Sequence, residues 1–275
     1  MGIKNCIATD GLTLYLTRMR RYSGDDLNIV EVWRLTIIFL RNKVAMSTSV
    51  GDYLYEDVYM RSWDLAKGIN DMLGEGPRKR ICLLCPGDVT HVISMWSCWM
   101  TGHVAVPLCP SRSQERLETI IQDSNCDLVI ATADQINRVH TITKKLGQKL
   151  IVLDDTWWSE PKTETENGDT SPLPRPFCDD DIIRDKNAMI LYTSGMTGRP
   201  RGVLYTHQVL QHQIESVISS WNLVTEDSVL HSLPLDTLYG CINSVQAPLS
   251  SGAKIINVPV NDDVKVRTQL ETNQF

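Results

Sequence analysis

Short apolar runs alternate with longer amphipathic segments along most of the chain, from about residue 59 to residue 258. A short continuous apolar run is typical of a buried strand, whereas apolar residues three and four positions apart indicate a helix that packs on a sheet. Strands are predicted at 80–85, 104–107, 128–131, 150–153, 188–192, 203–205, 228–233 and 253–258, and helices at 63–73, 88–101, 111–121, 134–146, 208–221 and 239–248. The pattern predicts an α/β fold of largely parallel sheets covered by helices on both faces.

Polar residues mark the expected ends of two of these helices. Asp88 precedes the apolar positions of one helix and is expected to cap it, and Gly102 is expected to end it. Ser111 and Gln114 have the spacing of a capping box, which predicts that the next helix opens there.

The domain is expected to extend over residues 53–275, with one interruption. Residues 159–181 are rich in Pro, Glu, Thr and Asp and lack apolar periodicity, so they predict a linker-like surface loop. Residues 1–52 show no clean periodicity and are interpreted as an N-terminal extension.

The first part of this extension is basic. Before Asp25 it carries Lys4, Arg18, Arg20 and Arg21 against a single acid. A basic segment with spaced apolar residues is a candidate mitochondrial transit peptide, and without that signal the expected location is cytoplasmic. The apolar run 33–40 is too short to cross a bilayer, so no membrane anchor is predicted.

Charge and cysteine content exclude some classes of partner and site. The chain has 27 Lys and Arg against 33 Asp and Glu, a net charge of −6, which argues against a nucleic-acid partner. Most of the 8 cysteines lie in apolar segments. Cys82 and Cys85 are expected to project to opposite faces of one strand, so neither a metal site nor a disulfide is predicted, and a reducing compartment is favoured.

The stretch YTSGMTGRPRGV, residues 192–203, concentrates the unusual chemistry of the chain. It follows an apolar strand and contains three glycines, the hydroxyl side chains of Thr193, Ser194 and Thr197, and the cation Arg201. Glycines let backbone N–H groups turn toward an anion, and the hydroxyls and the guanidinium add donors, so the loop suits a triphosphate. Its residues do not match the commonest phosphate loop, GxxxxGK[ST], or the dinucleotide pattern GxGxxG, and a glycine-rich surface hairpin is the alternative.

The order TSGxTGxPxG resembles the signature loop of the adenylate-forming acid-CoA ligases, the superfamily that includes acyl-CoA synthetases and luciferases. Over residues 53–259 the chain is most similar to the malonate-CoA ligase branch. The segments that carry this resemblance are WSCWMTGHVAVPL (96–108), AMILYTSGMTGRPRGVLYTH (188–207) and VLHSLPLDTLYG (229–240).

The resemblance implies a two-step reaction that uses ATP, Mg²⁺ and coenzyme A. A small carboxylic acid, malonate or a fatty acid, attacks the α-phosphorus of ATP to give an acyl-adenylate and pyrophosphate, and the thiol of coenzyme A then displaces AMP. The ATP-phosphate contacts that it implies lie at Thr193, Ser194, Gly195, Met196, Thr197, Gly198, Arg201 and Gly202. His207 also matches a common family position, and a purely structural role at the start of the next helix is the alternative.

Three residues depart from the family pattern. Met196 replaces a hydroxyl residue, and Arg201 stands where a lysine is usual, which keeps the charge but changes its shape. Asp236 replaces a histidine near the expected acyl pocket, where a carboxylate would repel malonate unless it is paired or faces solvent.

The resemblance also places several family parts beyond Phe275, namely the adenine contacts, the Mg²⁺-binding Glu and the C-terminal domain with the adenylating lysine. The sequence is therefore expected to contain part of the N-terminal, AMP-binding domain and to lack the C-terminal domain. Two functional interpretations stay open: an AMP-forming acid-CoA ligase, or a non-catalytic relative that acts as a nucleotide-binding or protein-interaction module.

Overall fold

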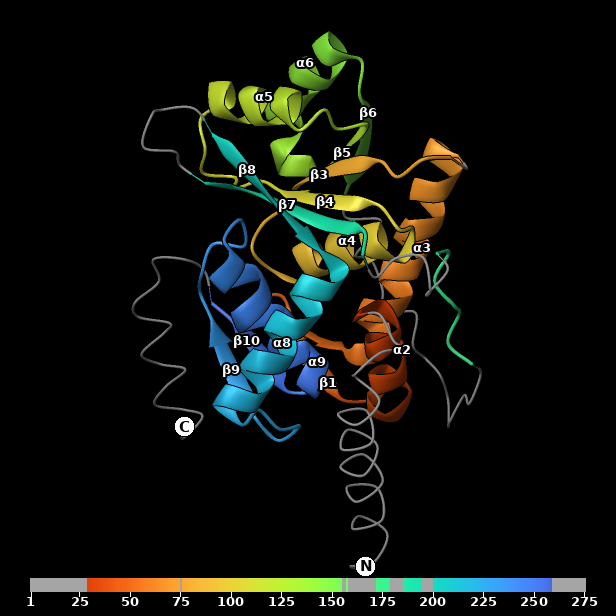
Figure 1. The fold of residues 1–275 in the computed structure, drawn as a ribbon, viewed down its shortest axis with the longest axis vertical. Coiled ribbons are helices and arrows are strands. Elements are labelled where there is room, and N and C mark those ends of the chain that lie inside the picture. Colours follow the sequence, from red (N-terminus) through yellow and green to blue (C-terminus); the bar gives the residue numbers. More distant parts are fainter. Residues whose placement is uncertain are drawn as a thin grey trace, which may run out of the picture.

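The computed structural model describes residues 29–74, 76–154, 157, 172–178, 185–193 and 200–258, and these form two sheets with helices packed around them (Figure 1). One sheet has six strands in the order β6-β5-β3-β4-β7-β8, and the other has four in the order β2-β1-β10-β9. All the pairings are parallel except β7–β8 and β1–β2, which are antiparallel. The predicted fold class, largely parallel sheets flanked by helices, is confirmed.

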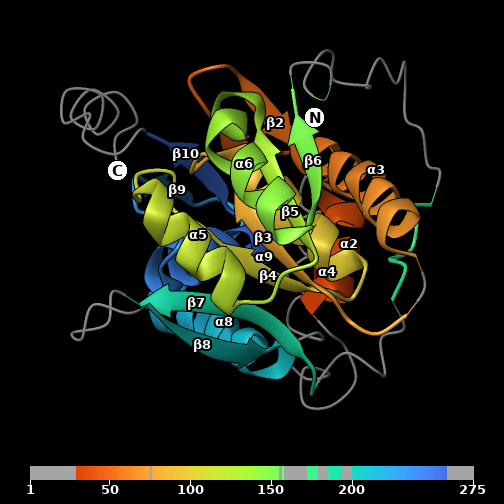
Figure 2. The ribbon, with the colours of Figure 1, turned by 90° about the horizontal axis from the view of Figure 1, so that it is seen from above.

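The inner strands of the six-stranded sheet, β3, β4, β5 and β7, are buried because they are almost continuously apolar, whereas the edge strand β8 is exposed over Arg201–Leu204. Helices α5 and α6 cover one face, which is seen from above in Figure 2, and α3 and α4 pack on the side that faces the second sheet. Cys82 and Cys85 belong to different apolar clusters, as their spacing predicts. The elements of this half are α3 (Tyr55–Leu73), β3 (Arg80–Leu84), α4 (Val89–Met100), β4 (Val104–Pro107), α5 (Gln114–Asp123), β5 (Leu128–Thr132), the 3₁₀ turn η1 (Ala133–Gln135), α6 (Ile136–Leu146), β6 (Lys149–Leu153), β7 (Asn187–Thr193) and β8 (Arg201–Thr206).

The four-stranded sheet brings the two ends of the described chain together. Strand β1 pairs in parallel with β10, and β10 pairs in parallel with β9. Where a single helix is predicted over 239–248, the structure has a π-helical segment followed by a short α-helix. The elements of this half are α2 (Ile29–Leu40), β1 (Val44–Ser47), β2 (Asp52–Leu54), α8 (His207–Trp221), β9 (Ser228–His231), the π-helical segment η3 (Tyr239–Gln246), α9 (Ala247–Ser251) and β10 (Lys254–Asn257).

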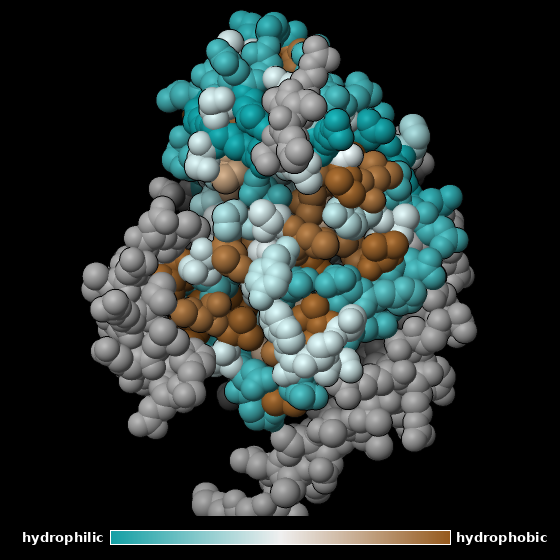
Figure 3. Space-filling model, turned by 60° about the vertical axis from the view of Figure 1, so that its left-hand side comes forward, coloured by the Kyte–Doolittle hydropathy of each residue, from teal (hydrophilic) through white to brown (hydrophobic). Residues whose placement is uncertain are grey.

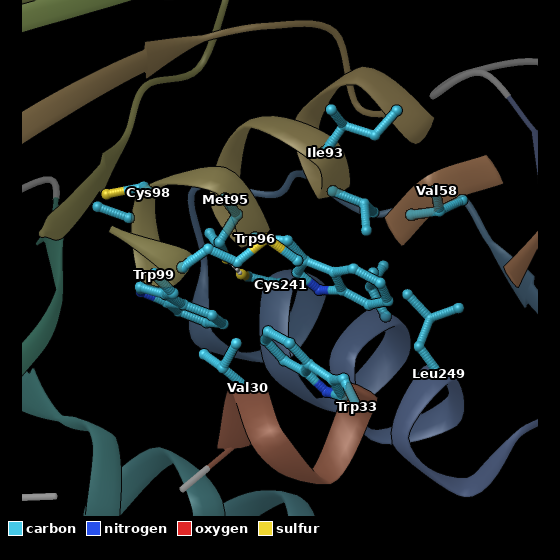
Figure 4. Close-up of a cluster of buried hydrophobic side chains, with 14 of the residues drawn as sticks. Val30, Trp33, Val58, Ile93, Met95, Trp96, Cys98, Trp99, Cys241 and Leu249 are labelled. Carbon is cyan, nitrogen blue, oxygen red and sulfur yellow. Dashed lines mark hydrogen bonds between the residues drawn. The ribbon is translucent and has the colours of Figure 1, made fainter. Parts of the chain in front are cut away.

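The N-terminal part of the described chain is not an extension. Helix α2 places Trp33 against α4, where its ring stacks on Trp96 at 4.6 Å and on Trp99 at 5.3 Å between centroids (Figure 4). The indole N–H of Trp33 also donates to Ser250 Oγ at 2.8 Å. The expectation for residues 29–52 is therefore wrong, because α2 and β1 bury apolar side chains in the same core as the rest of the fold. Residues 1–28 lie outside the described residues.

The helix ends follow the capping rules with one shift. The Asp88 carboxylate accepts from the Thr90 N–H at 2.8 Å and caps α4, as predicted. Helix α5 is capped by Ser113, whose Oγ accepts from the Arg116 N–H, and not by Ser111, whose Oγ contacts Cys109 Sγ at 3.0 Å. The capping-box prediction thus placed this helix start two residues too early.

No helix in the described ranges is long and apolar enough to cross a membrane.

Candidate functional site

The predicted phosphate loop joins two hydrogen-bonded strands at the edge of the six-stranded sheet. Strands β7 and β8 are antiparallel, with Tyr192 opposite Gly202 and Thr193 opposite Arg201. Thr193 Oγ1 donates to the Arg201 carbonyl at 3.4 Å. The segment between the strands predicted at 188–192 and 203–205 is therefore shorter than the sequence pattern indicates, because Thr193, Arg201 and Gly202 belong to the strands. Of the predicted phosphate contacts, Ser194, Gly195, Met196, Thr197 and Gly198 lie outside the described residues.

Gly202 has a packing role within the strand pair. A Cβ at this position would meet Ile190 Cγ2 at 3.0 Å and Tyr192 Cζ at 3.2 Å. A glycine is needed here because the side chains of the neighbouring strand come close, and not because the backbone adopts an unusual angle. Beside it, Arg201 is an exposed residue at the start of β8.

A hydrogen bond from Tyr192 connects the end of β7 to α5. The Tyr192 hydroxyl donates to Asp123 Oδ2 at 2.7 Å at the end of α5. Burial raises the pKa of the Tyr192 phenol above its usual value, and the Asp123 carboxylate adds to this shift. The phenol is therefore a neutral donor at physiological pH, and it ties the strand before the loop to α5.

Asp236, the candidate acyl-pocket residue, is buried and paired. Its side chain is 7% exposed, and its Oδ2 accepts from Arg112 Nε at 3.1 Å and from Arg112 Nη2 at 2.5 Å. Arg112 Nη2 also donates to the Tyr192 carbonyl at 3.2 Å. Of the two alternatives to repulsion, pairing is the one that the structure shows, since the guanidinium compensates the carboxylate.

Arg112 is itself held in place. Arg138 of α6 donates through Nη2 to the Arg112 carbonyl and through Nη1 to the Pro110 carbonyl. Gln135 Oε1 accepts a further bond from Arg138 Nη1 at 2.9 Å. The segment after β4 is thus fixed by one arginine and presents a second arginine to Asp236.

Two openings lie near these residues. A wide groove of ≈ 700 Å³ runs between α5 and Pro200 and is lined mainly by polar side chains. A narrower pocket of ≈ 510 Å³ lies where strands of both sheets end, with Gly87, Thr132 and Leu233 among its lining residues. Asp236 lines neither opening. Figure 3 shows a hydrophilic surface over the upper part of the molecule, which holds α5 and α6, and apolar groups near the middle of this face.

His207 packs in the interior. It is the first residue of α8, is 1% exposed, and lies edge-on to Trp99 with centroids 5.9 Å apart. Burial lowers its pKa to about 3, so the ring is neutral at physiological pH. This geometry favours the structural role over a chemical one.

In the described part of the chain, no group of three His, Cys, Asp or Glu side chains is arranged to hold a metal ion.

The sequence over residues 40–273 matches the AMP-binding enzyme family. Together with the parallel sheets and the hydroxyl- and glycine-rich hairpin, this match shows that the chain belongs to the AMP-binding enzyme family. Among curated proteins it is 33% identical over 236 residues to the mitochondrial malonate-CoA ligase ACSF3 of Xenopus laevis, with 84% of this chain and 40% of that protein covered. It is 32% identical over 222 residues to the human protein of the same name, with 79% and 37% covered. The chain thus spans about two-fifths of the length of these relatives.

Solved structures show the same fold. ATP-bound MatB from Rhodopseudomonas palustris superposes with a TM-score of 0.74 at 19% identity, covering 90% of this chain and 48% of that one. The N-terminal domain of FACL13 from Mycobacterium tuberculosis gives 0.71 at 23% identity, covering 89% and 60%.

Neither Arg112 nor Asp123 is among the site residues predicted from the sequence. Arg112 follows β4, whose carboxyl end lies beside that of β7 because the two strands are parallel neighbours. A charged residue shortly after a parallel strand was the available signal, since such residues gather at one edge of the sheet.

Proposed function

We propose that this protein activates a carboxylic acid with ATP and transfers the acyl group to coenzyme A. The acid's carboxylate oxygen forms a bond to the α-phosphorus and pyrophosphate leaves; the thiol sulfur then bonds to the acyl carbon, and AMP leaves as the thiol proton is released. The main support is the hairpin β7–β8, which carries a hydroxyl- and glycine-rich loop in a chain whose relatives include malonate-CoA ligases.

Malonate is the favoured substrate, with a fatty acid as the second choice, because relatives over most of this chain carry the name malonate-CoA ligase. Those relatives are also named mitochondrial, which agrees with the basic segment before Asp25. Mitochondrial targeting is therefore part of the proposal.

The loop residues from Thr193 to Gly202 would bind the β- and γ-phosphates of ATP, which enters with its Mg²⁺. Transfer at phosphorus needs charge neutralisation more than covalent help, and amide and hydroxyl donors supply it. Arg201, exposed at the start of β8, contributes a positive charge beside the phosphates.

A second candidate is a nucleotide-binding module without turnover. The observation that favours it is the departure of Met196 and Arg201 from the usual loop residues. The coding sequence beyond Phe275 separates the two: an in-frame aromatic-Gly-x-Thr-Glu motif followed by a late lysine supports the ligase.

ATP binding by purified residues 1–275 tests the phosphate loop. Several contacts of about 1 kcal/mol net each predict a dissociation constant of roughly millimolar size. Arg201→Ala should weaken binding several-fold, whereas Lys67→Ala should not, because Lys67 lies on α3 over the Trp63 ring. Isothermal titration calorimetry measures both, and a chain that does not bind ATP would contradict the proposal.

Turnover is a separate measurement. Residues 1–275 alone are expected to form no acyl-CoA from malonate or fatty acids, because the resemblance assigns the Mg²⁺-binding Glu and the adenylating lysine to positions beyond Phe275. Each missing transition-state contact costs about 3 kcal/mol or more. Robust acid-dependent ATP–pyrophosphate exchange by residues 1–275 would rule out the non-catalytic candidate.

A further inference from the structure

Arg112 connects three segments that are far apart in sequence. It lies after β4, binds the Asp236 carboxylate after β9 through two donors, and donates to the Tyr192 carbonyl near the end of β7. Strand β9 belongs to the four-stranded sheet, and β4 and β7 belong to the six-stranded one. One guanidinium therefore joins the carboxyl-end side of both sheets.

The bond to the Tyr192 carbonyl is made at the entry to the phosphate loop. Tyr192 is opposite Gly202 in the strand pair, and only Thr193 separates it from Ser194. A planar guanidinium that fills two acceptors at fixed angles restricts both more than a lysine would. The position of the loop entry relative to Asp236 is therefore set by Arg112.

The same contact sets the charge at position 236. A carboxylate that is 7% exposed and has lost its cationic partner would repel an approaching dicarboxylate and would itself be poorly solvated. With Arg112 in place the pair has no net charge, so position 236 does not repel an anionic acid.

We propose that Arg112 is a positioning residue for the acid-activating reaction, which rests on the proposed function: it fixes the start of the phosphate loop against the acid-binding end and cancels the charge of Asp236. Arg138 supports it by binding the carbonyls of Pro110 and Arg112. A displacement of Asp236 is therefore expected to move the loop entry at Tyr192 through Arg112.

The experiment compares Arg112→Gln, Arg112→Lys, Asp236→Asn and the double variant Arg112→Gln/Asp236→Asn in the 275-residue chain. The matched control is Arg41→Gln, which removes an ion pair of similar burial: Arg41, in the turn after α2, is 16% exposed and its partner Glu56 on α3 is 17% exposed. Hydrogen–deuterium exchange of the amides in 187–206 reports the hairpin without any ligand, and calorimetry with ATP reports binding.

Arg112→Gln should speed exchange at the loop end of the hairpin and weaken ATP binding several-fold, because the loop entry loses the guanidinium that holds it. The double variant should be less impaired than Arg112→Gln, because no unpaired carboxylate remains, and Arg112→Lys should rescue only part of the loss.

Two results would overturn the inference: Arg41→Gln changes hairpin exchange as much as Arg112→Gln, or the double variant is no better than Arg112→Gln. A chain that binds no ATP, but whose hairpin exchange responds to Arg112 and recovers in the double variant, contradicts the proposed function and leaves the positioning role of Arg112 standing.

Discussion

Replacing Trp33 by alanine should destabilise the whole domain, although the residue lies in a stretch that the sequence pattern assigns to an extension. The side chain is 1% exposed and stacks on Trp96 and Trp99. Removing a buried tryptophan costs about 3–5 kcal/mol. The upper part of that range is expected, because Ser250 Oγ also loses its 2.8 Å donor. Against a typical stability of about 5–15 kcal/mol, this loss is large.

Urea unfolding followed by far-UV circular dichroism measures the effect without relying on tryptophan fluorescence. Trp33→Phe keeps an aromatic ring in the stack and loses the hydrogen bond, so it should cost about 1–2 kcal/mol. Ile38→Ala is the control on the same helix, since Ile38 is 39% exposed, and it should change stability by less than about 1 kcal/mol.

Deletion variants test the same reasoning at the level of the domain. A chain lacking residues 1–28 should keep its cooperative unfolding transition, whereas a chain lacking 1–52 loses α2 and β1 and should not fold cooperatively. Equal stability losses for Trp33→Ala and Ile38→Ala, or cooperative unfolding without residues 1–52, would refute the assignment of α2 to the core.

Three further predictions follow from the same structure. Burial lowers the pKa of His231 to about 4 and that of His91 to about 3, so both side chains are neutral in the folded chain near pH 7. As the pH drops from about 6.5 to about 4, the unfolded chain binds these protons first, so the free energy of unfolding measured by urea titration should fall. A free energy of unfolding that does not change over this pH range would contradict the prediction. Gly240→Ala would place a Cβ 2.1 Å from the Pro234 carbonyl oxygen, so it should lower the urea midpoint and disturb the turn that holds Asp236; an unchanged midpoint would show that the turn relaxes freely. A fluorescent fusion should reach mitochondria and lose that destination when Arg18, Arg20 and Arg21 are changed to Glu, and a diffuse cytosolic signal from the unmutated fusion would end the targeting hypothesis.

Sequence periodicity identified the strands and helices after residue 59 because each has a continuous apolar run or one apolar face. The residue at which each helix begins was harder to predict. Ser111 and Ser113 both have the chemistry of a cap, and only the backbone path decides which one meets a free amide. Helix α2 was not predicted because it is apolar on several sides, so its apolar residues do not recur with a clear helical spacing.

The candidate site was predicted only in its local part. The loop 192–203 can be recognised because its residues are contiguous, and the strands that flank it are where the pattern places them. The partner of Asp236 is 124 positions away in the chain, and no local pattern links Arg112 to it. Such a pair depends on how two sheets meet, which single-sequence reasoning does not supply.

The burial of α2 sets a limit on proteolytic maturation. If a processing protease removes the basic leader, its cut has to fall before Ile29, because cutting within α2 would release Trp33 from its stack. The basic segment ends near Ser23, so the cleavage site is confined to about residues 24–28. This short stretch contains two consecutive acids, Asp25 and Asp26. The mature N-terminus and the integrity of the core are therefore coupled, and a cut after Trp33 would remove the ring that stacks on Trp96 and Trp99.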